Sequence, residues 1–439
     1  MSNFAKLRLL ASVFRPRFFG FYQGHAMLTP IELEAVHALV GADNHLETER
    51  EFERAFAKAA GGGEAVSFAA GRMAFYALLR ALGIGKDDEV LLTGFTCAVM
   101  ANAVWRVDAT ARYADIAEDT LGTSVADVAR KLGQHTRAIV VQHTFGLPCD
   151  IAALAELARS RGIPLIEDCA LTLGSTLDGQ PVGSWGDAAI FSTDHSKPLN
   201  TMIGGLLVTR NPALAEKVRM MQAEAPALDA AHRQRLWRRL VLERAEFTPS
   251  RYGRGRVIAK LSNAPRKLRQ RFGGPEDAVF LEADFKPRLK TDTYPYPARL
   301  PVFLAQLGLF ELARWPAVAE HRRSVLERLL QAAPPGVRNG LPAAYADSRR
   351  EINPLRLAYA HASAMEIERR MRATVDVDDV WFREPIVCAT LGPASFGYQP
   401  GECPVAERVG RNIVNWPCAV PEADVPELLE LFAKCHRNL

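Results

Sequence analysis

The chain has 439 residues, of which 48% are hydrophobic and 24% are charged, and its formal net charge at pH 7 is +4. This length is enough to bury a large core and predicts two domains, and the ordinary composition excludes a low-complexity or fibrous protein. The seven cysteines are scattered without metal-type spacing, so we expect reduced thiols, no metal site and a cytoplasmic location. No run of eighteen apolar residues is present, which predicts that no segment spans a membrane.

We expect residues 1–30 to form an N-terminal arm that precedes the large domain. Lysine and arginine interrupt their apolar runs, so they lack the continuous apolar region of a secretory signal. We expect this arm to pack along the protein or to form a loose tail. The alternative is that its basic and aromatic side chains lie along a membrane surface.

The next part of the chain alternates between helical and strand-like patterns. Two amphipathic helices are expected over 31–60. Strand-like segments follow at 65–68 (AVSF), 88–95 (DEVLLTGF), 109–116 (ATARYADI), 137–146 (RAIVVQHTFG), 164–170 (PLIEDCA) and 187–193 (DAAIFST), with helical segments between them. Strands that alternate with helices are typical of a mostly parallel sheet covered on both faces. The sequence therefore predicts an α/β fold for a large domain over 31–300.

The alternation stops after Val208, where a basic insert of about residues 211–293 begins. From Lys217 to Arg271 there are fifteen Lys and Arg residues and four acidic ones, a charge of +11 that leaves −7 for the rest of the chain. This surplus favours an anionic partner, such as a substrate diphosphate or an anionic membrane surface, over a solvated helical excursion against a dimer partner. Nucleic acid is not expected, because the insert has few aromatic residues for base stacking.

A long helix is expected from about residue 301, where the insert has ended. It leads into a smaller α+β domain that we assign to 301–439.

Three features fall at carboxyl ends of predicted strands, where ligands bind in parallel sheets. Gly71 and Arg72 follow AVSF and open a helix, so their backbone N–H groups can hold a phosphate. Asp168 ends PLIED, and Ser192 and Lys197 follow DAAIF. Each feature alone is more often a turn, a helix cap or a solvated lysine. Together they suggest pyridoxal 5′-phosphate, a carbonyl cofactor that needs a lysine, an acid and phosphate donors.

Five longer segments resemble the DegT/DnrJ/EryC1/StrS family. They are 71–104 (GRMAFYALLRALGIGKDDEVLLTGFTCAVMANAV), 140–154 (VVQHTFGLPCDIAAL), 163–209 (IPLIEDCALTLGSTLDGQPVGSWGDAAIFSTDHSKPLNTMIGGLLVT), 298–312 (ARLPVFLAQLGLFEL) and 403–417 (CPVAERVGRNIVNWP). The segment from Asp168 to Lys197 matches almost without gaps. The resemblance covers roughly 31–210 and 294–439, and it implies a fold-type I, pyridoxal-phosphate-dependent enzyme that aminates keto-sugars, mostly nucleotide-linked ones.

The resemblance also implies a role for each matching residue. Lys197 would hold the cofactor and then serve as general base and acid, and Asp168 would pair with the ring nitrogen. Ser192, Gly71 and Arg72 would bind the phosphate.

Fold-type I enzymes complete their sites across a homodimer interface. The resemblance therefore implies a homodimer, in which Tyr296 and Arg299 are candidates for reaching into the neighbouring site.

Several positions depart from the family pattern. Cys97 replaces the aromatic residue that often stacks on the cofactor ring, and Leu171 replaces the glutamine near its phenolic oxygen. The usual histidine is displaced by one position to His195, and Asp194 takes its place. We expect these residues to line the cofactor or substrate site.

Three functional hypotheses follow. The first is an aminotransferase that moves an amino group from an amino-acid donor, glutamate by resemblance, to a nucleotide-linked keto-sugar for polysaccharide or natural-product synthesis. The second applies the same chemistry to an amphiphilic or lipid-linked ketone at the inner membrane face. The third is a non-catalytic regulator with this fold, against which the retained Lys197 counts.

Overall fold

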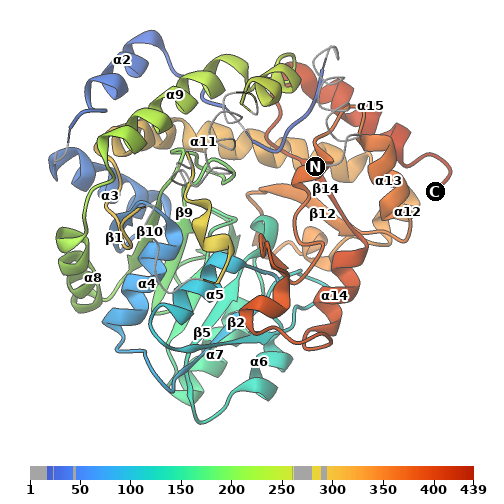
Figure 1. The fold of residues 1–439 in the computed structure, drawn as a ribbon. Helices are drawn as coiled ribbons and strands as arrows, with labels where there is room; N and C mark the ends of the chain where they lie inside the picture. Colours follow the sequence, from blue (N-terminus) through green and yellow to red (C-terminus); the bar gives the residue numbers. More distant parts are fainter. Residues whose placement is uncertain (1–16, 23, 43–45, 260, 262–278, 288–293) are drawn as a thin grey trace.

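The computed structural model of the chain describes residues 17–22, 24–42, 46–259, 261, 279–287 and 294–439. At its centre lies a seven-stranded sheet in the order β1-β10-β9-β6-β5-β2-β4 (Figure 1). Its strands are β1 (Glu64–Phe68), β2 (Glu89–Thr93), β4 (Thr110–Ala114), β5 (Thr136–Gln142), β6 (Leu165–Asp168), β9 (Ala188–Ser192) and β10 (Gly205–Thr209). Strands β9, β6, β5, β2 and β4 are parallel, whereas β10 runs antiparallel to both of its neighbours. The expected α/β fold with a mostly parallel sheet is confirmed.

Helices cover both faces of this sheet because its strands are apolar on both sides. Val90 and Leu92 in β2 pack in one apolar cluster together with α4 (Gly71–Ala81) and α5 (Ala98–Trp105). Leu91 between them packs in a second cluster with α6 (Val125–Lys131) and α7 (Ile151–Arg161). The same alternation holds along β5. The other helices of this part are α2 (Pro30–Ala38), α3 (Leu46–Ala59), and α8 (Pro212–Glu224) and α9 (Ala230–Glu246) in the insert.

The carboxyl ends of four strands meet at one edge of the sheet. Strands β5, β6 and β9 end at Gln142, Asp168 and Ser192. Strand β1 has the same direction as β9, since both are antiparallel to β10, and it ends at Phe68. The segments that follow these strands are therefore brought to one place.

The Gly204–Gly205 pair determines how closely β10 approaches the start of α4. A Cβ atom on Gly205 would lie 2.1 Å from the backbone nitrogen of Gly71 and 2.2 Å from its Cα. Gly204 has a φ of +143° and forms a bridge with Ala70. Because no side chain fits between them, these two glycines allow the first turn of α4 to lie directly on the sheet edge.

The C-terminal part of the chain begins with α11 (Val302–Gln331), the long helix expected from about residue 301. It packs against α2, α3 and α15. Beyond it lie α12 (Pro335–Arg338), α13 (Ala364–Met371), α14 (Pro404–Arg411), α15 (Val425–Cys435) and the two-stranded sheet of β12 (Arg356–Ala360) and β14 (Ile413–Pro417). Short strands lie at β3 (Thr96–Cys97), β7 (Thr176–Leu177), β8 (Gln180–Pro181), β11 (Arg350–Glu351) and β13 (Ile386–Val387).

Among the described helices, α11 alone is long and apolar enough to cross a membrane by length and composition. Half of its most apolar window is buried inside the fold, where Phe303, Leu304 and Leu307 have no exposed surface. This burial explains the apolar composition of α11 as that of a core helix.

The described part of the N-terminal arm packs against the C-terminal part of the chain. The backbone N–H of Phe19 donates to the carbonyl of Thr374 at 2.7 Å, and the N–H of Asp376 donates to the carbonyl of Phe19 at 2.9 Å. Phe18, Phe19 and Phe21 are buried. Residues 1–16 lie outside the described residues, so the alternative of a membrane contact was not tested there.

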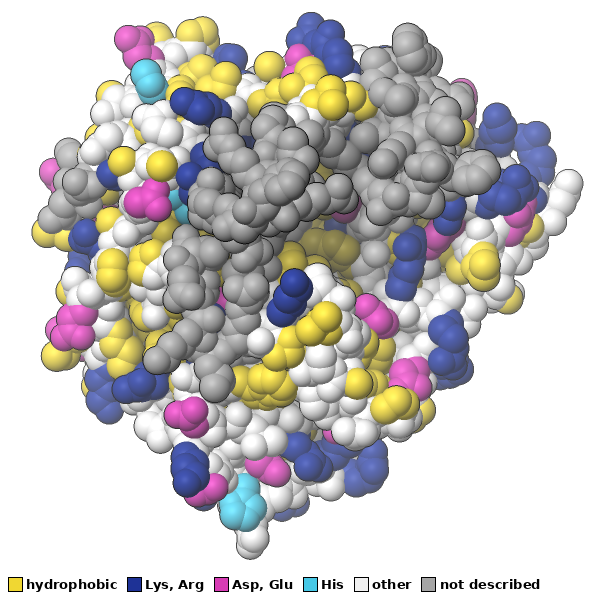
Figure 2. Space-filling model, in the orientation of Figure 1, with side chains coloured by type: hydrophobic (Ala, Val, Ile, Leu, Met, Phe, Trp, Pro, Cys, Tyr) yellow, Lys and Arg dark blue, Asp and Glu magenta, His cyan; other side chains and the backbone are white. Residues whose placement is uncertain are grey.

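Many basic side chains of the insert have partners within the chain. Arg219 pairs with Glu53 at 2.9 Å, and Arg239 pairs with Glu243 at 2.6 Å. Other such contacts join Arg233 to the Ala42 carbonyl, Arg244 to the Leu28 carbonyl, Arg254 to Glu246 and Arg256 to Asp376. On the face drawn in Figure 2, Lys and Arg side chains are spread among acidic ones and do not gather in one patch. Lys217 and Arg238 are exposed, and the basic residues at 260, 266, 267, 269, 271, 288 and 290 lie outside the described residues.

Candidate active site

A pocket lies at the carboxyl edge of the sheet. The predicted residues that line it are Gly71, Arg72, Cys97, Asp168, Leu171, Ser192, Asp194 and Lys197. The fold therefore brings together residues from distant parts of the sequence.

Lys197 lies in the loop between β9 and β10, and the small hydroxylated residues around it fix that loop. The hydroxyl of Thr201 donates to the carbonyls of Thr193 at 3.1 Å and Ile203 at 2.8 Å. The backbone N–H of Lys197 donates to the carbonyl of Asp194 at 2.9 Å. From α11, the buried Arg322 donates to the carbonyl of Pro198 at 3.4 Å. The loop is thus tied at several points, which holds the long lysine side chain over the pocket.

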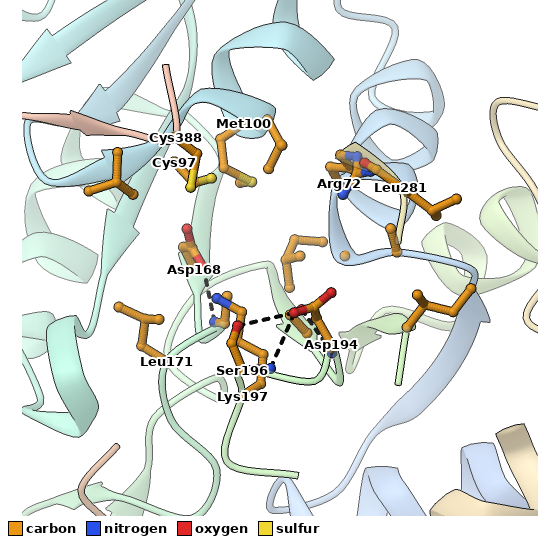
Figure 3. A pocket seen from close by; sticks show the side chains of 18 of the residues that line it. Arg72, Cys97, Met100, Asp168, Leu171, Asp194, Ser196, Lys197, Leu281 and Cys388 are labelled. Carbon is orange, nitrogen blue, oxygen red and sulfur yellow. Dashed lines mark hydrogen bonds between the residues drawn. The ribbon is translucent and has the colours of Figure 1, made fainter. Parts of the chain in front are cut away.

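The Lys197 amine and the Asp168 carboxylate line the same pocket (Figure 3). The Nζ atom of Lys197 also lies 4.4 Å from the ring centroid of Trp381. This distance allows a cation–π contact with the protonated amine. Trp381 comes from the C-terminal part of the chain, so that part supplies one wall of the site.

The carboxylate of Asp168 is almost completely buried, with 4% of the residue exposed. Burial raises the pKa of Asp168, and the N–H of Ala170, at 3.0 Å, and the charge of Lys197 only partly oppose this effect. A buried carboxylate with a raised pKa is stabilised by any cation placed against it. Asp168 is therefore suited to hold a protonated ring nitrogen.

The first turn of α4 lies at the pocket. Its N-cap, Ala70, has no side-chain hydrogen bond to the helix, and Ala69, Ala70 and Gly71 line the pocket with Ser192. An uncapped helix N-terminus carries a partial positive charge and binds anions. This end of the pocket is suited to a phosphate group.

The Arg72 side chain is bound by residues at the end of the insert. Its Nε donates to the carboxylate of Asp284 at 2.6 Å, and its Nη2 donates to the carbonyl of Leu281. Asp284 has no exposed surface and also accepts from Arg106 at 2.9 Å and from the Tyr294 hydroxyl at 2.8 Å. Although burial opposes it, the charge of Asp284 raises the pKa of Arg72. Arg72 can therefore serve the phosphate site through its backbone, whereas its charge is neutralised by the insert.

Three of the predicted residues are not among those that line the pocket: His195, Tyr296 and Arg299. His195 forms an ion pair with Asp194 at 2.9 Å and stacks on Phe280 with 4.0 Å between ring centroids. Burial alone would lower the pKa of His195, but the negative charge of Asp194 outweighs it and the pKa is raised.

Tyr296 and Arg299 contact their own chain. The Tyr296 hydroxyl donates to the carbonyl of Arg72 at 3.1 Å, and the Arg299 N–H donates to the carbonyl of Pro226 at 3.0 Å. The side chain of Arg299 lines a separate small cavity beside Glu49. Within one chain, both residues are thus part of the packing around α4 and α8.

Several lining residues were not expected from the sequence. Among them, Leu281 and Phe285 come from the end of the insert, and Trp381, Phe382, Val387 and Cys388 come from the C-terminal part. None of these six belongs to a periodic apolar pattern or to the segment from Asp168 to Lys197, so no local signal marks them.

The residues of this pocket fit pyridoxal 5′-phosphate. A carbonyl requires an amine, which Lys197 supplies. A pyridine nitrogen requires an acid, which Asp168 supplies. A phosphate requires donors, which the start of α4 and Ser192 supply.

A second polar cluster nearby consists of His143, Glu167 and Cys169, and its spacing could suit a metal ion. However, Glu167 already accepts from His143 and from the backbone N–H groups of 183, 185 and 186, so this cluster supports the loop after β8.

Comparison with known proteins gives consistent matches. Residues 32–241 match the model of the DegT/DnrJ/EryC1/StrS aminotransferase family. An L-glutamine:2-deoxy-scyllo-inosose aminotransferase of Streptomyces fradiae is 36% identical over 188 residues, which are 43% of this chain and 44% of that protein. A GDP-perosamine synthase of Escherichia coli O157:H7 is 35% identical over 185 residues, which are 42% of this chain and 50% of that protein. The chain thus spans about half the length of the curated relatives it matches.

The similarity of fold extends further along the chain. The crystal structure of the aminotransferase TlmJ from Streptoalloteichus hindustanus matches with a TM-score of 0.67 and 24% identity, covering 94% of this chain and 98% of that one. This match shows that the fold is shared over almost the whole chain, beyond the residues matched by the family model.

Proposed function

We propose that this chain, as a member of the DegT/DnrJ/EryC1/StrS aminotransferase family whose model matches residues 32–241, is a pyridoxal 5′-phosphate-dependent aminotransferase. It transfers an amino group from an amino-acid donor to the ketone of a keto-sugar. The observation that carries the proposal is that Lys197 and Asp168 line one pocket, beside the uncapped N-terminus of α4.

The side chains of this chain divide the work of the reaction. When bound, the cofactor supplies a carbonyl that condenses with amines and a ring that accepts electrons from the substrate carbon. Lys197 holds the cofactor. Its Nζ then serves as the general base that takes the proton from the donor carbon and as the general acid that delivers it again. Asp168 keeps the ring nitrogen protonated. The first turn of α4 and Ser192 bind the phosphate, and Trp381 covers the lysine from the C-terminal side.

For the substrates, we propose glutamate as donor and a nucleotide-linked keto-sugar as acceptor. The names of the relatives support a keto-sugar or related cyclic ketone, since one acts on an inosose with L-glutamine and another makes GDP-perosamine. We further propose a cytoplasmic homodimer with a large domain over 31–300 and a small domain over 301–439. An anionic membrane surface is a further candidate partner of the basic insert.

The first test is covalent capture of the cofactor. Wild-type protein loaded with pyridoxal 5′-phosphate, reduced with borohydride and digested should carry the cofactor mass on the peptide that contains Lys197. The Lys197→Ala variant should lose this adduct. Lys217→Ala, which changes an exposed lysine on α8, should retain it. An adduct on other lysines alone would contradict the proposal.

The second test measures the donor half of the reaction. Without an acceptor, loaded wild-type protein should release about one equivalent of 2-oxo acid per site from glutamate or glutamine, because the amino group remains with the cofactor. Lys197→Ala should release none. Capture of the cofactor without any 2-oxo acid would favour the non-catalytic hypothesis.

A further inference from the structure

The seven cysteines of this chain do not have equal access to solvent. All seven lie in the described residues, and five of them are buried. The other two are Cys97, which is partly buried, and Cys388, which is exposed. These two line the same pocket as Lys197, and Figure 3 draws their side chains together beside Met100. The two most accessible thiols of the chain therefore lie next to each other.

Two short strands bring these cysteines together from distant parts of the sequence. Strand β13 (Ile386–Val387) runs parallel to β3 (Thr96–Cys97), with Val387 opposite Cys97. Cys388 follows at once with a φ of +65°, so the chain leaves the strand at this residue. Both cysteines line the pocket, and their proximity follows from this strand register.

The surroundings make Cys97 the more reactive thiol. The hydrogen bond from the Cys388 thiol lowers the pKa of Cys97 to about 7 despite burial, and the Val99 N–H and the charge of Lys197 act in the same direction. Cys97 is also the N-cap of α5, where the helix dipole favours a thiolate. The same hydrogen bond raises the pKa of Cys388. One thiolate and one neighbouring thiol is the arrangement that forms a disulfide.

We propose that Cys97 and Cys388 are a reversible oxidation site at the cofactor pocket, which a peroxide converts to a disulfide. The Cys97 thiolate attacks one peroxide oxygen and breaks the O–O bond, so that a sulfenic acid and, after protonation, one water form. The Cys388 sulfur then attacks the Cys97 sulfur, and the second oxygen leaves as water with the two remaining protons. Two thiols are oxidised to one disulfide while one peroxide is reduced to two waters.

The disulfide joins two segments that are distant in the sequence. Cys97 follows β2 in the large sheet, and Cys388 follows Trp381 in the C-terminal part. The bond fixes the position of β13 against β3 and removes the thiolate near Lys197. Oxidation is therefore expected to lower turnover, and a dithiol reductant is expected to restore it.

The chemistry is tested on the full chain by mass spectrometry, which requires no activity. After treatment with hydrogen peroxide and alkylation without reductant, digestion should give a peptide pair joined through Cys97 and Cys388. Its mass should be about 2 Da below that of the two free peptides. Dithiothreitol should return both cysteines to the alkylated form. Two matched variants distinguish the roles: Cys388→Ser should leave a sulfenic acid on Cys97 that dimedone traps, whereas Cys97→Ser should give little dimedone adduct on Cys388.

The outcomes separate clearly. Cross-linked peptides and dimedone capture at Cys97 support the proposal whether or not the chain proves to be an aminotransferase. If both cysteines stay separately alkylated after peroxide treatment, or if each variant traps dimedone equally, the proposal is overturned. A cross-link that forms without any change in 2-oxo acid release refutes its effect on turnover.

Discussion

Asp168 ends β6 and has one backbone hydrogen bond, from Ala170, to its buried carboxylate. Its second oxygen is therefore available to a cation in the pocket. Replacing Asp168 by Asn keeps the size of the side chain but removes its charge, so the ring nitrogen loses the group that keeps it protonated. We expect Asp168→Asn to retain covalent cofactor and to lose turnover by about 100-fold, close to 2.7 kcal/mol in the barrier.

This prediction is checked by single-turnover 2-oxo acid release after the bound cofactor has been quantified. Asp178→Asn is the matched control, since Asp178 is exposed in a turn, and it should behave as wild type. Turnover of Asp168→Asn within twofold of wild type would remove Asp168 from the proposed role.

Glu49 on α3 has only 6% of its surface exposed. Burial, with the charge of Glu53 next, raises the pKa of Glu49 to about 7 from 4.5. The folded state therefore binds a proton more tightly than the unfolded state. The contribution of Glu49 to stability is therefore complete below pH 4.5 and is lost as the pH rises to 7. The free energy of unfolding falls by roughly 3 kcal/mol over this range.

We expect Glu49→Gln to unfold at higher urea than wild type at pH 8 and to match it at pH 5. Urea unfolding followed by circular dichroism at both pH values provides the measurement. Glu51→Gln, on the exposed face of the same helix, should change little at either pH. An equal gain at both pH values would show that the Glu49 charge is not the cause.

The 3₁₀ segment η2 (Glu282–Phe285) connects the end of the insert to the helices beside the pocket through side-chain contacts. Its Asp284 binds Arg72 on α4 and Arg106, which directly follows α5. Removing a buried carboxylate leaves both guanidinium groups without their charged partner. We expect Asp284→Ala to destabilise the fold by about 3–5 kcal/mol.

Thermal or urea unfolding measures this loss. Glu118→Ala is the comparison, because Glu118 forms an exposed pair with Arg408, with side chains 55% and 52% exposed, and such pairs contribute about 1 kcal/mol or less. If the two variants lose the same stability, Asp284 is not a structural tie.

The elements that hold the cofactor residues were predictable because each carries a local pattern. Strands β2 and β5 alternate between two apolar clusters, and the segment from Asp168 to Lys197 resembles the family almost without gaps. Trp381 and Asp284 could not be predicted. Each lies in a short segment without periodicity, and its position depends on long-range packing against α4, α5 and the Lys197 loop. The direction of the Arg72 side chain could not be predicted for the same reason, since its partner Asp284 is distant in sequence.

At the scale of the whole molecule, we expect an isologous homodimer. The shared fold with aminotransferases extends over most of the chain, and two-fold dimers are the commonest closed assembly. Light scattering at assay concentration should give twice the 48.3 kDa of the chain. A fully active monomer would contradict this. Because Tyr296 and Arg299 contact their own chain, residues other than these two would complete the neighbouring site in the dimer.

The contact of Phe19 with Thr374 and Asp376 has a consequence for synthesis on the ribosome. Domains fold as units while the chain grows from its N-terminus, so the central sheet can form as soon as β10 has emerged. Phe19 is made early, but its two backbone partners, Thr374 and Asp376, emerge only near the end of synthesis. Its neighbour Phe18 finds its backbone partner, Pro249, and its ring partner, Tyr252, earlier. The N-terminal segment is therefore fixed in two stages, first by the insert and last by the C-terminal part.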